Sequence, residues 1–177
     1  RDIDGDVPSK PFGGSGDYTW APDSRSLVFS ARIAGSSEPW STNFDLYRLP
    51  LDGGAPVNLT EANTAWDAAP VYSRDGGTLY YLAMKRPGFE ADRYAIMAMD
   101  VATGQVREVA PDWDRSPSSL AVADDGSTLF VAAQDTGQYP LFRVDAATGK
   151  VERLVGDGSV SAFDVAGDTI ALTRNAL

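Results

Sequence analysis

The sequence contains no cysteine and no histidine among its 177 residues. The missing thiols exclude disulfides, thiolate metal sites and a cysteine nucleophile. The missing imidazole excludes a Ser-His-Asp triad made by this chain alone, because that mechanism needs a histidine to carry the proton. The stretch that comes nearest to a nucleophile elbow is GGSGD, and it ends in Asp17 where the G-x-S-x-G turn requires a glycine.

Basic residues are also scarce, and this argues against a nucleic-acid partner. The 15 Lys and Arg against 25 Asp and Glu give a net charge of −10, with no basic stripe. No apolar run is long enough to span a bilayer, so we expect no membrane partner. Asp2, Asp4 and Asp6 alternate as in a calcium loop, but Val7 stands where that loop needs glycine. We predict no metal site and no cofactor.

What the sequence does contain is a repeat of about fifty residues, the length typical of propeller blades. Four segments share a pattern of aromatic and β-branched residues around an Asp/Gly/Ser turn, and they lie at 18–32, 70–84, 119–133 and 161–175. A second pair of elements follows each of the first three segments, at 45–60, 94–110 and 139–155. The equivalent anchor residues are 52, 50 and 41 positions apart, and they are Leu27, Leu79, Leu129 and Ile170.

Each full unit is typical of four short antiparallel strands. Alternating β-branched and aromatic residues between Asp-Gly and Thr-Gly turns indicate hairpins, and no segment indicates a helix. Four-stranded antiparallel units at this period predict propeller blades, whereas a β-sandwich or a three-sheet solenoid is the weaker alternative. We therefore predict an all-β fold, a partial β-propeller of four-stranded antiparallel blades.

The repeat also predicts how this single propeller domain divides. Residues 1–12 are expected to form the outer strand of a preceding blade, and three blades are expected at 13–60, 61–110 and 111–155. The segment 156–177 would begin a further blade. Because closed propellers usually need about four to eight blades, we interpret the chain as a piece of a larger propeller. Unpaired strand edges invite association, so a homo-oligomer is left open.

Antiparallel connectivity places the loops on two faces. The turns between first and second strands and between third and fourth strands share one face and are short. The second-to-third loops and the blade connections share the other face and are rich in Trp, Asp, Glu and Arg, so we predict that function lies there. In two connections a tryptophan is expected to wedge between blades and the next aspartate to cap a turn: Trp66-Asp67-x-x-Pro70 and Trp113-Asp114-x-x-Pro117.

The repeat resembles that of TolB-type propellers. Three stretches further resemble the propeller domain of S9 (prolyl oligopeptidase family) serine peptidases, especially the bacterial dipeptidyl-peptidase 5 and acylaminoacyl-peptidase branch: STNFDLYRLPLDGGAPVNLT, AMKRPGFEADRYAIMAMD and DWDRSPSSLAVADDGSTLF. In that family the propeller caps a C-terminal α/β-hydrolase domain with a Ser-Asp-His triad. The resemblance therefore implies two partners, a downstream hydrolase domain outside this chain and an oligopeptide substrate.

The same resemblance gives a role to the stretch PGFEADR at 87–93. In the dipeptidyl peptidases of the family, acidic residues of the propeller hold the free amino terminus of the substrate. By that likeness Glu90 would accept the ammonium group in a charge-assisted contact. Arg93 would hold Glu90 or Asp92 in place, or take a substrate carbonyl, and Phe89 would supply an apolar wall. The alternative is an exposed acid–arginine pair inside the loop, which is worth little.

This sequence departs from the pattern of the better-known dipeptidyl peptidases, which use two adjacent glutamates. Ala91 separates Glu90 from Asp92, so the assignment cannot be copied directly. Asp114 and Arg115 in the neighbouring WDRS stretch are further candidates. Arg115 could equally pair with the loop of the third blade or with the downstream domain.

Two functions from different classes follow. The first is a propeller segment that gates an S9 serine peptidase and helps to bind the peptide N-terminus. The second is a non-catalytic TolB-like propeller that acts as a protein-interaction module. The RPGFEADR and WDRS stretches favour the first, because a simple binding repeat does not require them. The compartment, bacterial periplasm or cytoplasm, is left open.

Overall fold

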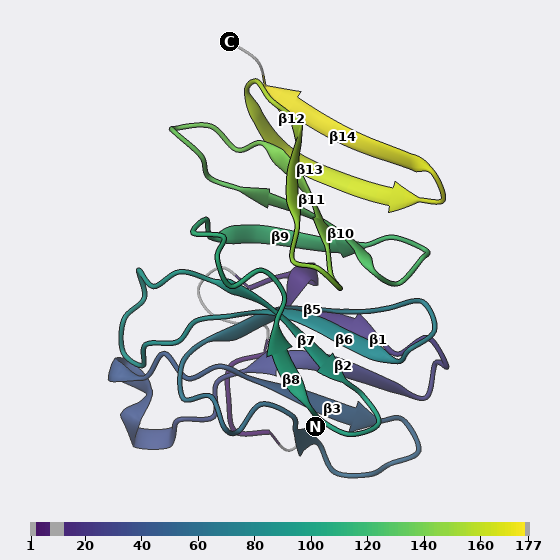
Figure 1. Ribbon diagram of the computed structural model, residues 1–177. Coiled ribbons are helices and arrows are strands. Elements are labelled where there is room, and N and C mark those ends of the chain that lie inside the picture. The colour runs from purple at the N-terminus through teal and green to yellow at the C-terminus, as the bar shows by residue number, and fades with distance from the viewer. Residues whose placement is uncertain (1–2, 8–12, 176–177) are drawn as a thin grey trace.

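The computed structural model describes residues 3–7 and 13–175, which fold into four stacked antiparallel sheets (Figure 1). Sheet 1 contains β1 (Tyr18–Trp20), β2 (Ser26–Ala31), β3 (Asp45–Pro50) and β4 (Val57–Asn58). Sheet 2 contains β5 (Asp67–Tyr72), β6 (Thr78–Ala83), β7 (Ala95–Asp100) and β8 (Val106–Glu108). Sheet 3 contains β9 (Pro117–Val122), β10 (Thr128–Ala133), β11 (Leu141–Asp145) and β12 (Val151–Val155). Sheet 4 is the hairpin of β13 (Ser159–Ala166) and β14 (Thr169–Asn175).

This architecture confirms the predicted all-β fold of four-stranded antiparallel units. Each of the first three sheets follows chain order from one edge to the other, as expected for successive hairpins. The helical segments in the described residues are two short 3-10 turns, η1 (Ser15–Asp17) and η2 (Gly35–Trp40), which the sequence did not indicate. None of the helices in this part of the chain is long and apolar enough to cross a membrane. The outer strand predicted over 1–12 falls largely outside the described residues.

The central strands are buried on both faces because each middle sheet is covered by a neighbour on either side. In β6, alternate residues point to opposite faces. Leu79 and Tyr81 pack toward sheet 1, whereas Tyr80 and Leu82 pack toward sheet 3. This two-sided burial explains why TLYYLA reads as a continuous apolar run instead of alternating with polar residues.

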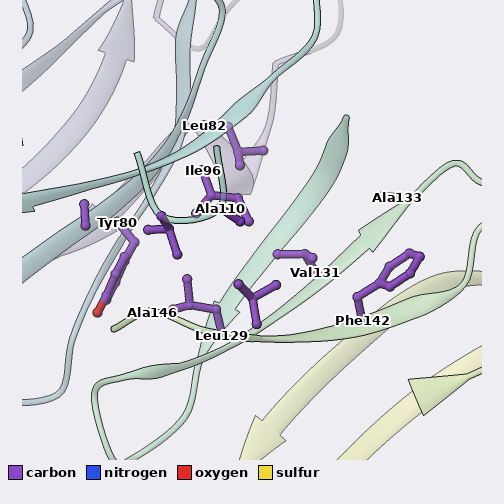
Figure 2. Close-up of a cluster of buried hydrophobic side chains, with 12 residues drawn as sticks. Tyr80, Leu82, Ile96, Ala110, Leu129, Val131, Ala133, Phe142 and Ala146 are labelled. Atoms are coloured by element: carbon purple, nitrogen blue, oxygen red, sulfur yellow. The ribbon is translucent and has the colours of Figure 1, made fainter. Parts of the chain in front are cut away.

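The largest apolar cluster lies between sheets 2 and 3 (Figure 2). Side chains from β6 and β7 meet side chains from β10 and β11, and Leu129 and Val131 at the centre are fully buried. A second cluster fills the space between sheets 1 and 2 around Val28 and Leu46, and a third joins sheet 3 to sheet 4 through Phe130 and Val160. The stack is therefore held together by sheet-on-sheet packing.

One face of the stack carries the β1–β2, β5–β6 and β9–β10 turns, which lie to the right in Figure 1. In each turn an aspartate accepts a backbone hydrogen bond from the residue two positions on, at 2.8 to 3.0 Å, and these aspartates are Asp23, Asp75 and Asp125. The residue after Asp75 and the residue after Asp125 are glycines with positive φ, and Ser24 takes that conformation at the first turn. The repeated motif thus serves turn formation.

The two tryptophans act as predicted, as wedges between sheets. Trp66 stacks on Phe44, which directly precedes β3 of sheet 1, with ring centroids 4.4 Å apart. Trp113 meets Phe142 of sheet 3 edge-on at 5.1 Å. Both contacts join a connection to a neighbouring sheet, which supports a structural role for the aromatic residue in each motif.

Replacing Leu129 by alanine is expected to lower the free energy of unfolding by about 3 kcal/mol, because the change leaves a cavity in the cluster between sheets 2 and 3. Leu154→Ala on β12, where the residue is 38% exposed, is the matched control and should cost less than about 1 kcal/mol. Urea unfolding of the two variants measures the difference. Equal losses would contradict the assignment of this cluster as the main core.

Candidate functional site

The loop between β6 and β7 carries the predicted PGFEADR stretch, and Asp92 braces it from inside. The Asp92 carboxylate accepts hydrogen bonds from the backbone N–H groups of Lys85 and Arg86 at 2.9 and 2.8 Å. Burial alone would raise the pKa of Asp92, but these hydrogen bonds and the nearby Arg86 charge together hold it below its usual value. Asp92 therefore shapes the loop and is not free to bind a ligand with both oxygens.

Arg93 also serves the framework, which corrects the expected pairing with Glu90 or Asp92. Its guanidinium donates to Glu108 on β8 at 2.9 Å and to the carbonyl of Trp113 at 3.1 Å. Lys85 reaches the same Glu108 carboxylate at 2.7 Å. Burial acts to raise the pKa of Glu108, yet its hydrogen bonds with the two cations lower it overall. The second half of the loop is thus tied to sheet 2 and to the connection that leads into sheet 3.

Glu90 and Phe89 are the two predicted residues that the braced loop presents to solvent. Phe89 is 42% exposed, and the Arg86 guanidinium lies 3.9 Å from its ring centroid. Glu90 is exposed, and its carboxylate makes no hydrogen bond or ion pair with any residue that the structure describes. An unpaired carboxylate can accept a charge-assisted hydrogen bond from a cationic group.

The Asp114–Arg115 pair lies in the connection between sheets 2 and 3. Arg115 donates to Asp135 in the β10–β11 loop at 3.0 Å and to Asp114 at 2.6 Å. The first contact is the pairing with the loop of the third unit that the sequence left open. Asp114 is strongly exposed, with 82% of its side chain accessible. The connection that carries these residues meets the end of the PGFEADR loop at two points: Arg93 donates to the Trp113 carbonyl, and the Tyr94 N–H donates to Ser116 Oγ at 3.0 Å.

A neighbouring loop adds an aromatic residue that the sequence analysis did not single out. η2 projects from the β2–β3 loop on the left of Figure 1 and ends at Trp40, which is 78% exposed. Arg32 anchors this segment by donating to the Ser41 carbonyl at 3.2 Å and to Glu38 at 2.9 Å. The two loops meet where the Gly88 N–H donates to Thr42 Oγ1 at 2.8 Å. The available signal was a tryptophan within a polar loop, SSEPWSTN.

Residues 54–168 match the family described as "Lactonase, 7-bladed beta-propeller". The match covers more than half of the chain, which therefore belongs to this family of β-propellers. The fold class predicted from the repeat and the membership found by comparison agree.

More specific similarity is to peptidases. The chain is 28% identical to dipeptidyl-peptidase 5 of Porphyromonas gingivalis, over 96% of this chain and 25% of that protein. Among solved structures, a putative TolB from Agrobacterium tumefaciens superposes with a TM-score of 0.70 at 19% identity, covering 90% of this chain and 54% of that one. An acylaminoacyl peptidase from Pyrococcus horikoshii gives a TM-score of 0.63 at 17% identity, over 89% of this chain and 23% of that one.

These comparisons confirm the resemblance to dipeptidyl-peptidase 5, acylaminoacyl-peptidase and TolB-type propellers. At this level of identity the two solved structures show the fold alone. The chain spans about a quarter of the length of the dipeptidyl-peptidase 5 relatives that it matches.

Asp92→Ala is expected to speed hydrogen exchange at the Lys85 and Arg86 amides at least about tenfold, because both lose their acceptor. Since the pKa of Asp92 is lowered, the bracing is present at neutral pH and lost only as the pH falls through that lowered value. Glu90→Ala in the same loop is the control and should leave these amides protected. Equal exchange in the two variants would show that Asp92 does not brace the loop.

Proposed function

We propose that this chain is part of the N-terminal propeller of an S9-family serine exopeptidase, where it gates access and helps to bind the amino terminus of an oligopeptide. An α/β-hydrolase domain of the same polypeptide would cleave the peptide. Two observations support the proposal. The dipeptidyl-peptidase 5 relatives are about four times as long as the matched region. The chain itself has no histidine with which to form a Ser-His-Asp triad.

The proposed binding role rests on Glu90. Its carboxylate is unpaired among the described residues, while Asp92 and Arg93, which follow Ala91, hold the loop. A loop that is ordered before the ligand arrives loses little conformational entropy on binding. A peptide ammonium group would find in Glu90 a charge-assisted acceptor without first breaking a salt bridge. Asp92 and Arg93 would then act as positioning residues.

The exposed rings of Phe89 and Trp40 complement this acceptor. They lie on two loops that touch through the Thr42–Gly88 hydrogen bond, on the face predicted to carry function. Aromatic side chains bury large apolar areas at low entropic cost, which suits them to contact peptide side chains. We infer that the first residues of the peptide lie against these rings when the ammonium group is at Glu90.

A second candidate function is that of a TolB-like protein-interaction propeller. The superposition on TolB, with a TM-score of 0.70, supports it at the level of fold. In that case Trp40, Phe89 and Glu90 would contact a partner protein, and the polypeptide would contain no hydrolase domain.

In the full-length enzyme, Glu90→Gln is expected to raise KM about tenfold or more for a peptide with a free amino terminus, because the amide keeps the shape and removes the charge. The same peptide with an acetylated amino terminus should react equally well with the wild type and the variant. Steady-state kinetics on the two substrates measures both effects.

Asp112→Asn is the control, because Asp112 is an exposed acid in the next connection of the same face. It should leave both substrates unaffected. A Glu90→Gln enzyme with an unchanged KM for the free-amine peptide would refute the amine-binding role. Absence of any peptidase activity in the natural polypeptide would favour the interaction module.

A further inference from the structure

Asp67 is a fully buried carboxyl group at the junction of sheets 1 and 2, and the proposed peptide site does not use it. The residue begins β5 and has 0% solvent exposure. Its Oδ1 accepts a hydrogen bond from Asn63 Nδ2 at 2.8 Å. Its Oδ2 has no hydrogen-bond partner among the described residues. An ionised carboxylate in such surroundings is costly, so the site favours the neutral acid.

A second buried carboxyl strengthens this preference. Asp45 on β3 is 7% exposed and accepts from Asn58 Nδ2 at 2.8 Å, while its Oδ1 has no partner in the described part of the chain. Burial is the main cause that raises the pKa of Asp67 to about 7, and the Asp45 charge adds to the rise, although the polar side chains of Asn63 and Thr60 offset part of it. The pKa of Asp45 is itself raised, chiefly by burial.

The fold does not require these two acids. β7 is the equivalent of β3 in the next unit and begins at Ala95, and β9 is the equivalent of β5 and begins at Pro117. The third unit does contain a Trp-Asp pair, Trp113-Asp114, which lies 47 residues after Trp66-Asp67. The corresponding strands, β5 and β9, begin 50 residues apart. Asp114 therefore lies in the connection ahead of β9 and is exposed. Among the described residues, buried acids occur at this one junction only.

Asp67 also links the two loops that carry the candidate site. Its backbone N–H donates to the Phe44 carbonyl at 2.8 Å, just after the η2 segment. Asn63 Nδ2 bridges the Asp67 carboxyl and the Met84 carbonyl, and the Met84 N–H returns a bond to the Trp66 carbonyl at 2.8 Å. Met84 directly precedes the loop that carries Glu90. The connection 63–67 is thus fastened to both loops around one carboxyl group.

We propose that Asp67 is a proton-dependent latch, whose neutral carboxyl keeps the connection 63–67 closed against Phe44 and Met84, and whose opening releases the proton and loosens the loop that carries Glu90. A groove of about 380 Å³, lined in part by Thr60, Asn63 and Met84, borders the latch and supplies the solvent that an ionised Asp67 needs. The consequence for peptide binding rests on the proposed role of Glu90, whereas the latch itself does not.

The direction of the pH effect follows from linkage. The closed junction keeps the proton on Asp67 up to a pH of about 7, while an opened junction exposes the group to water, where its ordinary pKa is 3.8. Between about pH 4 and pH 7, each unit rise in pH therefore raises the ratio of open to closed junctions about tenfold. Above about pH 7 this ratio is constant. The latch is closed in acid and opens more readily at neutral pH.

Three described titratable groups act on Asp67. Tyr81 on β6 and Tyr94 ahead of β7 stay neutral, because burial raises the pKa of both phenols. Asp45 also titrates, with a pKa raised chiefly by burial, and the Asp67→Asn variant separates its contribution from that of Asp67. Glu61 acts on Asp45 from the connection that follows β4. Among the cations nearby, Arg32 lies 5.0 Å from the Phe44 ring centroid and Lys85 is paired with Glu108.

The test is hydrogen exchange by mass spectrometry on the full-length polypeptide, across the range from about pH 4 to pH 9 and corrected for intrinsic exchange rates. In the wild type, peptides that contain Asp67, Met84 and Gly88 should lose protection about tenfold per pH unit up to about pH 7 and then level off. Asp67→Asn, which mimics the neutral acid, should remove this dependence. Asp114→Asn, at the exposed copy of the motif, should keep it.

A flat wild-type profile, or an unchanged dependence in Asp67→Asn, would overturn the latch. If Asp67→Asn does not fold, infrared titration of the wild type decides: a protonated buried carboxyl should persist until about pH 7. Complete ionisation of every carboxyl by about pH 5 would refute the proposal. Because neither readout involves a ligand, a neutral Glu90→Gln result would reject the amine-binding role and leave the latch standing.

Discussion

The middle sheets are buried on both faces, and this two-sided burial decides where polar groups can lie. A strand such as β6 must satisfy two apolar interfaces at once, one toward sheet 1 and one toward sheet 3. Its buried side chains are therefore used for packing and are not available to a ligand. Polar and charged groups are displaced to the ends of the strands, where the loops begin. The location of any site on this scaffold follows from that displacement.

The acidic residues have different roles on the two faces of the stack. On one face, aspartates such as Asp75 and Asp125 form tight turns. On the other face three acids bind within the framework and one does not. Asp92 and Glu108 hold a loop in place, Asp67 is buried at a junction, and Glu90 is unpaired among the described residues. The exposed Glu90 carboxylate and the exposed Phe89 ring beside it in the sequence are the features on which the proposed binding role rests.

The fold could be predicted from the sequence because the repeat and its turn residues encode it locally. Asp-Gly and Thr-Gly turns and strand-length apolar runs specify hairpins without knowledge of long-range contacts. The site was only partly accessible to the same reasoning. Which acid Arg93 binds depends on β8 lying beside β7, so Glu108 could not be found from the loop alone. Likewise, Asp67 and Asp114 share a motif, but Asp67 is the first residue of β5, whereas Asp114 lies three residues ahead of β9. This difference buries Asp67 and exposes Asp114.

The proposal that this propeller belongs to a serine peptidase can be tested with an activity-based probe. The full-length natural polypeptide that contains these residues would be treated with a fluorophosphonate, which labels activated serines. We expect a labelled polypeptide far heavier than the 18.8 kDa of this chain. An intact full-length polypeptide that takes up no label would contradict it, and the exposed face would then be a surface for a partner protein.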